Sequence, residues 1–251
     1  MITNKKWFRI AIFYFVAIAF SYSMRCMFPE WYKSITLPYG FSAYKSWIQG
    51  LGPLLGAILV TWIFAVKRKN TLFGSSKSQS LLMGIVPIAV LSIAGVKNSE
   101  GLGIHYYGFI LGFWIIVYGI FEETGWRGYL HDELRGLKPV LKYLIIGTLW
   151  YGWHFTFLRD GTTFKNELII YLVLVLAGWG IGQIAEKTNS ILASGCFHTI
   201  GNIMGLSEIF RTNLSPDQKY LIIAVCLLIW IPFIIRWEKK PLAITGLSSD
   251  T

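Results

Sequence analysis

Long apolar segments constrain the fold of this chain more than any other feature of its sequence. The clearest one runs from Ser46 through Val66 without a charged residue and ends at Lys67-Arg68-Lys69. A helix needs roughly 20 mostly apolar residues, and at least ~17, to cross the hydrocarbon core of a bilayer. This length predicts an all-α polytopic transmembrane helical bundle with about eight transmembrane helices. The predicted spans are residues 7–24, 46–66, 80–96, 105–121, 141–157, 167–185, 190–206 and 220–237.

The composition agrees with a protein solvated mostly by lipid. Of the 251 residues, 54% are apolar and 14% are charged, whereas a soluble domain carries about 25% charged residues. A net charge of +10 is compatible with a nucleic-acid partner, but the basic residues lie in short loops between apolar segments. Such loops are typical of positive-inside topology and of contact with anionic headgroups. We therefore expect a lipid bilayer, and no nucleic acid, as the partner.

The whole chain, residues 1–251, is predicted to form a single integral-membrane domain, because it has no internal repeat and no low-complexity stretch. The first span follows Lys5 and Lys6, as a signal peptide would. No small-residue cleavage site follows it, so we expect it to remain as a span. Three cysteines without a close pair indicate neither a disulfide framework nor zinc-finger spacing.

Lysine and arginine residues in the loops predict the orientation. With eight spans and a cytoplasmic N-terminus, 15 of the 23 basic residues fall on the cytoplasmic side. This excess predicts that both termini are cytoplasmic. The cytoplasmic group includes the loop 67–79 and the segments around Arg127, Lys187 and Lys239-Lys240.

Two adjacent carboxylates, Glu122 and Glu123, stand where the predicted fourth span ends. A charge near hydrocarbon loses its hydration, so carboxylates at this place suggest a function. If the helix continues past Phe121, Glu123 and Arg127 lie four residues apart on one face and can pair. Glu122 then points elsewhere and is free to act as a general base for water. The alternative is an interfacial charge cluster in a cytoplasmic loop, formed with Arg127, Asp132, Glu133 and Arg135.

Later spans contain further polar groups. His154 ends the sequence Trp150-Tyr151-Gly152-Trp153-His154, and His198 precedes Asn202 by four residues on the same predicted helix face. A histidine can orient water or bind a metal, and His and Asn side chains can donate hydrogen bonds to a developing oxyanion. The alternatives are a core histidine with satisfied hydrogen bonds and simple hydrogen bonding between helices. His105, His131 and Cys196 are weaker candidates, and neither a His-Glu-x-x-His nor a Gly-x-Ser-x-Gly motif is present.

In this combination the chain resembles the CPBP family of membrane proteins, also called the Abi or CAAX-protease-like family. The family pattern is Glu-Glu-x-x-x-Arg, then an aromatic residue four positions before a His, then His-x-x-x-Asn or similar. The resemblance spans about 121–205, within a motif-bearing core of about 105–206. The matching segments are Glu122-Glu123-Thr124-Gly125-Trp126-Arg127, Trp150 to His154 with Trp where many members have Phe, and His198 to Asn202.

The resemblance implies an intramembrane endopeptidase that acts on a peptide or a membrane-proximal protein segment. It implies that Glu122 activates water with help from His154, and that His198 and Asn202 stabilise the oxyanion. Glu123 and Arg127 would support the helix end. No residue points to a prenyl substrate, although the family takes its name from prenylated CAAX proteins. The small size and short loops look bacterial, so we expect the protein in a bacterial cell membrane.

Other classes of function remain open from the sequence. One is a non-catalytic membrane scaffold or bacteriocin-immunity protein that binds a partner. Another is a proton-coupled transporter, which ranks last because no inverted repeat is visible. Two histidines and a carboxylate could hold zinc, but Asn202 is a poor zinc ligand and no second carboxylate is evident to orient the histidines. We predict a metal-free site, with zinc as the alternative, and the sequence leaves the oligomeric state open.

Overall fold

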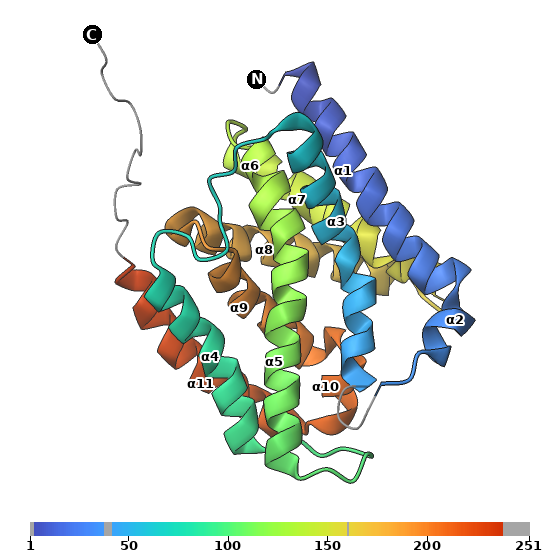
Figure 1. The fold of residues 1–251 in the computed structure, drawn as a ribbon, viewed down its shortest axis with the longest axis vertical. Helices are drawn as coiled ribbons and strands as arrows, with labels where there is room; N and C mark the ends of the chain where they lie inside the picture. The colour runs from blue at the N-terminus through green and yellow to red at the C-terminus, as the bar shows by residue number, and fades with distance from the viewer. Residues whose placement is uncertain (1–2, 38–41, 160, 238–251) are drawn as a thin grey trace.

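The computed structural model describes residues 3–37, 42–159 and 161–237, and these residues form helices and connecting loops without a β-strand (Figure 1). Eight helices correspond to the eight predicted spans: Asn4–Tyr22 (α1), Ser46–Phe64 (α3), Lys77–Ala94 (α4), Ile104–Glu123 (α5), Pro139–His154 (α7), Phe164–Thr188 (α8), Ile191–Gly201 (α9) and Pro216–Ile235 (α11). Lys239 and Lys240, which entered the charge count, lie outside the described residues.

Six described segments are long and apolar enough to cross a membrane, judged by length and composition. They contain α1, α3, α4, α5, α8 and α11. The helix α7 has 16 residues, slightly fewer than the ~17 needed to cross hydrocarbon. The apolar segment 191–206, which contains α9, is also short. The all-α polytopic membrane bundle predicted from the sequence is confirmed, and two of its eight helices are shorter than an ordinary span.

Short helical elements connect the long helices. Three of them are π-helical turns: η1, which continues α1, η3, which continues α5, and η5, which continues α9. Extra residues in π-helical turns re-aim side chains, and such turns are frequent at functional sites. The short elements are Ser23–Met27 (η1), Pro29–Ser34 (α2), Ser42–Lys45 (η2), Thr124–Leu130 (η3), His131–Glu133 (α6), Thr156–Leu158 (η4), Asn202–Leu206 (η5) and Glu208–Asn213 (α10).

The helix α5 occupies the middle of the bundle, where it packs against α3, α4 and α9 (Figure 1). Its contact with α9 depends on two glycines, Gly119 and Gly195. A Cβ atom on Gly119 would lie 3.0 Å from the carbonyl oxygen of Gly195. Small residues let helix backbones approach closely inside a membrane. The end of α5 therefore lies directly beside the middle of α9.

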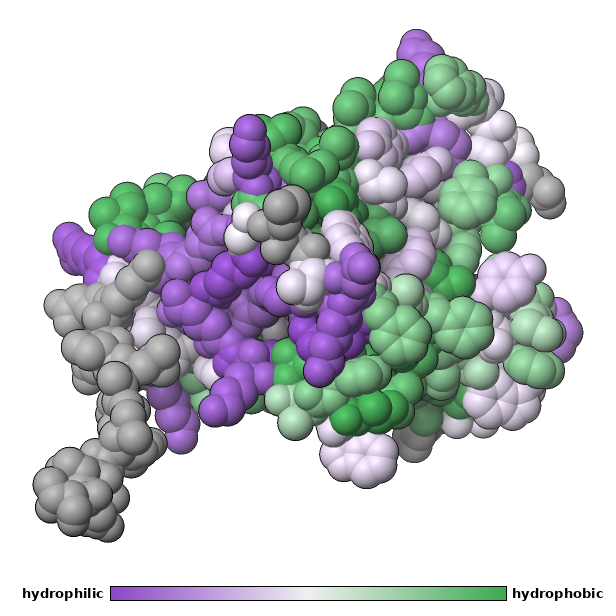
Figure 2. All heavy atoms as spheres, turned by 90° about the horizontal axis from the view of Figure 1, so that it is seen from above, coloured by the Kyte–Doolittle hydropathy of each residue, from purple (hydrophilic) through white to green (hydrophobic). Residues whose placement is uncertain are grey.

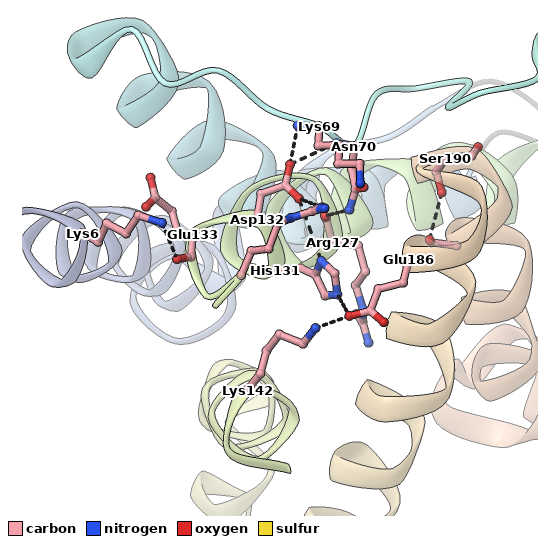
Figure 3. Close-up of polar contacts among 12 residues, drawn as sticks. Lys6, Lys69, Asn70, Arg127, His131, Asp132, Glu133, Lys142, Glu186 and Ser190 are labelled. Carbon is pink, nitrogen blue, oxygen red and sulfur yellow. Dashed lines mark hydrogen bonds and ion pairs between the residues drawn. The ribbon is translucent and has the colours of Figure 1, made fainter. Parts of the chain in front are cut away.

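One end of the bundle gathers polar side chains, and we call it the polar end. Here the side chains of Lys6 and Arg9 reach Glu133, and Lys142 pairs with Glu186 (Figure 3). The loop after α3 joins this end through a bridge between Thr71 and the residue that precedes α9. Seen from above in Figure 2, hydrophilic residues gather near the middle of this end, with apolar residues on several sides.

The segments at the polar end are those that the charge count placed together on the cytoplasmic side. Trp237, two residues after the end of α11, joins them as well, because its Nε1 donates to Ser75 Oγ. The contacts therefore agree with the expected grouping of loops. The assignment of this end to the cytoplasm stays a prediction.

Apolar side chains cover much of the outside of the bundle. The exposed fractions of Trp62, Ile93 and Leu228 are 80%, 78% and 74%. Large apolar residues at such exposure are costly in water and inexpensive in hydrocarbon. These surfaces therefore face lipid in the membrane.

Candidate active site

Glu122 lies inside the bundle, although the sequence placed it at a membrane boundary. The apolar segment ends at Phe121, but the chain remains helical through η3 and α6 as far as Glu133. Glu122 therefore precedes the polar end by eleven residues, or roughly 16 Å at ~1.5 Å per residue. The expected position at the end of the fourth span is wrong, because hydropathy marks where polar residues begin and not where the helix stops.

The depth of His154 below the polar end can be compared with that of Glu122. His154 follows Lys142, which lies at the polar end, by twelve helical residues or roughly 18 Å. Glu122 and His154 therefore come to similar depths.

Glu123 connects two of the sequence motifs. Its Oε1 accepts a hydrogen bond from Nη1 of Arg127 at 2.9 Å and lies 2.7 Å from Nδ1 of His198. The side chains of Glu123 and Arg127 are fully buried. The predicted pairing of Glu123 with Arg127 is therefore present, and Glu123 in addition orients His198. The expectation that no second carboxylate orients a histidine is wrong, because α9 approaches α5 closely enough to bring His198 to Glu123.

Glu122 faces a different set of side chains. Its Oε2 accepts a hydrogen bond from Nε1 of Trp150 at 3.1 Å. Its Oε1 lies 3.8 Å from Nε2 of His198, which is beyond hydrogen-bond distance. Glu122 is only 1% exposed, so the carboxylate is held against these groups and away from lipid. The sequence did not reveal the contact with Trp150, which it presented only as the aromatic position of a motif.

His154 is the last residue of α7, and the chain turns immediately after it. Phe155 adopts a left-handed conformation with φ 54°, which ends the helix. The Nδ1 atom of His154 lies 2.8 Å from the carbonyl oxygen of Trp150. A carbonyl oxygen only accepts, so Nδ1 carries a proton and donates. In a neutral ring the lone pair then lies on Nε2, which is the atom available to a water molecule or a substrate.

Asn202 begins the π-helical turn η5, one residue after α9 ends. Its Nδ2 atom is buried and lacks a hydrogen-bond partner among the described residues. A buried donor without a partner costs roughly 1–3 kcal/mol. The amide of Asn202 is therefore a donor that a bound substrate can satisfy.

A cavity of about 600 Å³ brings the predicted catalytic residues together. Glu122, His154, His198 and Asn202 all line it, although they come from α5, α7, α9 and η5. The cavity holds all four residues to which the resemblance assigns catalytic roles, and those roles stay predictions. Three arginines also line the cavity, although in the sequence they are ordinary basic residues of the loops. They are Arg25, Arg159 and Arg211.

The remaining histidines lie elsewhere. His105, at the start of α5, has its Nδ1 2.8 Å from the carbonyl oxygen of Ser92. His131 is buried at the polar end, where its Nε2 lies 3.5 Å from Glu186 (Figure 3). Within the described part of the chain, no three His, Cys, Asp or Glu side chains form a group that could hold a metal ion. Metal dependence is therefore left to experiment.

The fold and the site together define a polytopic helical membrane protein with a buried carboxylate–histidine–asparagine cavity. Residues 105–204 match the sequence model of a family described as type II CAAX prenyl endopeptidase Rce1-like. The chain is also similar to CAAX prenyl protease 2 of Methanococcus maripaludis, with 27% identity over 139 residues. The resemblance to the CPBP, or CAAX-protease-like, family is therefore confirmed.

These matches cover only part of this chain and of the archaeal protein. The alignment with the archaeal protein covers 51% of this chain and 49% of that protein, so the chain spans about half the length of the curated relative. The family match contains all three motifs, from the Glu pair to Asn202. It therefore covers the elements that carry Glu122, His154, His198 and Asn202, and it does not cover α1 to α4, α10 or α11.

Proposed function

We propose that this protein is an intramembrane endopeptidase that hydrolyses a peptide bond in a peptide or membrane-proximal protein segment. The observation that carries the proposal is the single cavity lined by the Glu122 carboxylate and the unpartnered amide donor of Asn202. A hydrolytic site needs a base for water and a donor for the oxyanion, and these two groups supply both. The likeness of residues 105–204 to CAAX prenyl endopeptidases supports the same reaction class.

In the proposed reaction, Glu122 takes a proton from a water molecule as that water attacks the scissile carbonyl carbon. Trp150 donates a hydrogen bond to one oxygen of Glu122, and Glu122 lines the cavity. The Nε2 atom of His154 accepts a hydrogen bond from the same water and orients it. When the tetrahedral intermediate collapses, Glu122 returns the proton to the leaving amine. The same carboxyl group therefore accepts and returns one proton in each reaction cycle.

The oxyanion of the intermediate is stabilised by Asn202 and His198 in this proposal. Nδ2 of Asn202 has no other partner to leave, so its hydrogen bond forms without breaking one. His198 is held through Nδ1 by Glu123, which turns Nε2 toward Glu122 and the cavity. With both nitrogens protonated, Nε2 donates to the oxyanion. Donors fixed before the reaction need no reorganisation during it, which is the main source of their effect.

Replacing Glu122 tests the proposal. Glu122→Gln keeps the shape of the side chain but removes the base. We expect cleavage to fall by about 10²–10⁴-fold, the usual contribution of a general base. Expression and thermal stability in detergent should stay near wild type. Glu30→Gln is the matched control, because Glu30 lies on α2 and its one ion pair in the described structure is with exposed Lys33.

The measurement compares membrane proteomes of cells that express wild type, Glu122→Gln or Glu30→Gln. A precursor should accumulate with Glu122→Gln alone. A scaffold or immunity protein that acts by binding would tolerate Glu122→Ala in a phenotype assay. Full function of both Glu122 variants would therefore reject the peptidase.

A further inference from the structure

The three arginines of the cavity differ from the basic side chains at the polar end. At the polar end, Arg9 pairs with Glu133 at 2.8 Å, and Lys142 pairs with Glu186. Among the described residues, no ion pair involves Arg25, Arg159 or Arg211. The basic groups beside the candidate active site therefore lack the carboxylate partners that the chain provides elsewhere.

Arg25 is fixed in the wall of the cavity. Its guanidinium group donates to the carbonyl oxygens of Trp153 at 3.1 Å and Gln49 at 3.4 Å, and it lies 4.2 Å from the ring centre of Trp153. Its Nε is buried without a hydrogen-bond partner. Arg25 therefore contributes a fixed positive charge, and its hydrogen bonds go to backbone carbonyl groups of the protein.

Arg159 and Arg211 are placed differently. Both are exposed, and neither side chain has a hydrogen bond within the described structure. Among the described residues that line the cavity, Glu122 is the sole carboxylate. Glu208 lines an adjoining cavity but forms no ion pair with either arginine in the described structure. Within the described structure, the two guanidinium groups therefore present positive charge without a carboxylate partner to a ligand that enters the cavity.

An apolar groove of about 660 Å³ continues from the same cavity between α8 and α9. Phe197, Ile200 and Met204 line it from the side of α9 and η5. The cavity and the groove share His198 and Arg211. The candidate site therefore has an apolar side and a basic side, and Arg211 stands where they meet.

We infer that the substrate is an apolar peptide segment that carries a carboxylate, with the carboxylate bound by Arg159 and Arg211 and the apolar residues in the groove. The inference rests on the proposed function and names its substrate class. Guanidinium groups bind carboxylates through two parallel hydrogen bonds and give them a fixed direction. The carboxylate can come from a peptide C-terminus or from an Asp or Glu side chain, which have the same recognition chemistry.

Binding can be measured separately from cleavage. The probe is a pool of peptides from a proteome digest, used once with its carboxylates intact and once after methyl esterification. The protein is the Glu122→Gln variant in liposomes, which should bind without cutting, and retained peptides are quantified by mass spectrometry. We expect esterification to lower retention of apolar peptides at least tenfold. Equal retention of the two pools would overturn the inference.

Substitutions in the same assay assign the binding to the two arginines. Arg159→Gln and Arg211→Gln, each added to Glu122→Gln, should lower retention of the intact pool about tenfold, a factor that corresponds to 1.4 kcal/mol. Arg211→Lys keeps the charge but loses the planar fork, so it should give an intermediate loss. Arg236→Gln is the control, because Arg236 is exposed and follows α11 near the polar end. Loss with Arg236→Gln equal to that with Arg211→Gln would overturn the assignment.

Two further experiments identify the source of the carboxylate and test whether the arginines bind lipid headgroups instead. Retained peptides are resynthesised with a C-terminal amide, or with Asp and Glu changed to Asn and Gln, and the form that loses binding identifies the source. Vesicles with and without anionic phospholipid show whether the arginines bind headgroups. If Arg159→Gln and Arg211→Gln change only vesicle association and not peptide retention, the inference is wrong.

The proposed function is judged on a different readout. Wild type and Glu122→Gln are incubated with the intact pool, and new peptide termini are counted. Absence of cleavage specific to wild type would reject the peptidase while leaving the carboxylate-dependent binding result valid.

Discussion

Oε1 of Glu123 lies 2.7 Å from Nδ1 of His198, and this contact joins the first sequence motif to the third. The same oxygen accepts the hydrogen bond of Arg127 at 2.9 Å. One buried carboxylate therefore fixes both the helix end that carries Glu122 and the histidine that faces it. Glu123 is best described as a positioning residue, because it acts through His198 and does not line the cavity.

Replacing Glu123 should reduce stability as well as activity. Glu123→Gln removes the charge that compensates the fully buried Arg127. Leaving one member of a buried pair uncompensated typically costs about 3–5 kcal/mol. We expect a clearly lower melting temperature in detergent for Glu123→Gln and a near-normal one for Glu122→Gln. A stable, inactive Glu123→Gln protein beside a fully active Glu122→Gln protein would show that the two roles are exchanged.

Trp150 is expected to position Glu122 through its indole N–H. Trp150→Phe removes the donor that lies 3.1 Å from Glu122 Oε2. It retains an aromatic ring for Arg127, whose guanidinium carbon is 4.6 Å from the Trp150 ring centre. A hydrogen bond to a charged group contributes about 1.5–3 kcal/mol, so kcat should fall roughly tenfold or more with little change in KM.

Trp153→Phe is the matched control for Trp150→Phe. It also removes a buried indole donor, which binds Ser21 Oγ at 2.9 Å. We expect a lower melting temperature from Trp153→Phe and a smaller change in kcat. Steady-state kinetics and thermal unfolding of both variants provide the comparison, and an equal kcat for Trp150→Phe and wild type would contradict the positioning role.

The polar end is predicted to face the cytoplasm. Single cysteines in a cysteine-free variant would test this by labelling intact cells with a membrane-impermeant maleimide. Ser75 suits this poorly, because its hydroxyl bonds to Thr188 and Trp237. Ser78 is exposed near the start of α4, and Ser99 is exposed in the loop that follows α4. Label should react with Ser99→Cys and not with Ser78→Cys, and the reverse pattern would invert the orientation.

Activity is predicted to be independent of metal. Glu122, His154 and His198 are the acidic and imidazole groups on the cavity, and Nδ1 of His198 is occupied by Glu123. Purified protein should retain cleavage in the presence of a strong chelator, and elemental analysis should find no stoichiometric zinc. Loss of activity on chelation, with recovery when zinc is added back, would assign His154 and His198 as zinc ligands.

The sequence by itself determined the class of fold and the candidate residues. Apolar segments of fixed length specify membrane helices, because a bilayer has one thickness and leaves no backbone polar group unpaired. The Glu pair, His154, His198 and Asn202 were conspicuous because polar groups are expensive in hydrocarbon and therefore rare there. Both inferences use local properties that can be read along the chain.

Only the tertiary structure decided which of these groups meet. The contact of Glu123 with His198 depends on the close approach of Gly119 and Gly195, which periodicity within one helix cannot reveal. The true depth of Glu122 depends on a helix that continues through polar residues to Glu133 because neighbouring helices bury them. The positions of Arg159 and Arg211 beside the cavity depend on how the segment after α7 and the helix α10 pack around it. Packing between distant segments sets all three, because the energy of a buried polar group depends on the partner it finds and not on its place in the sequence.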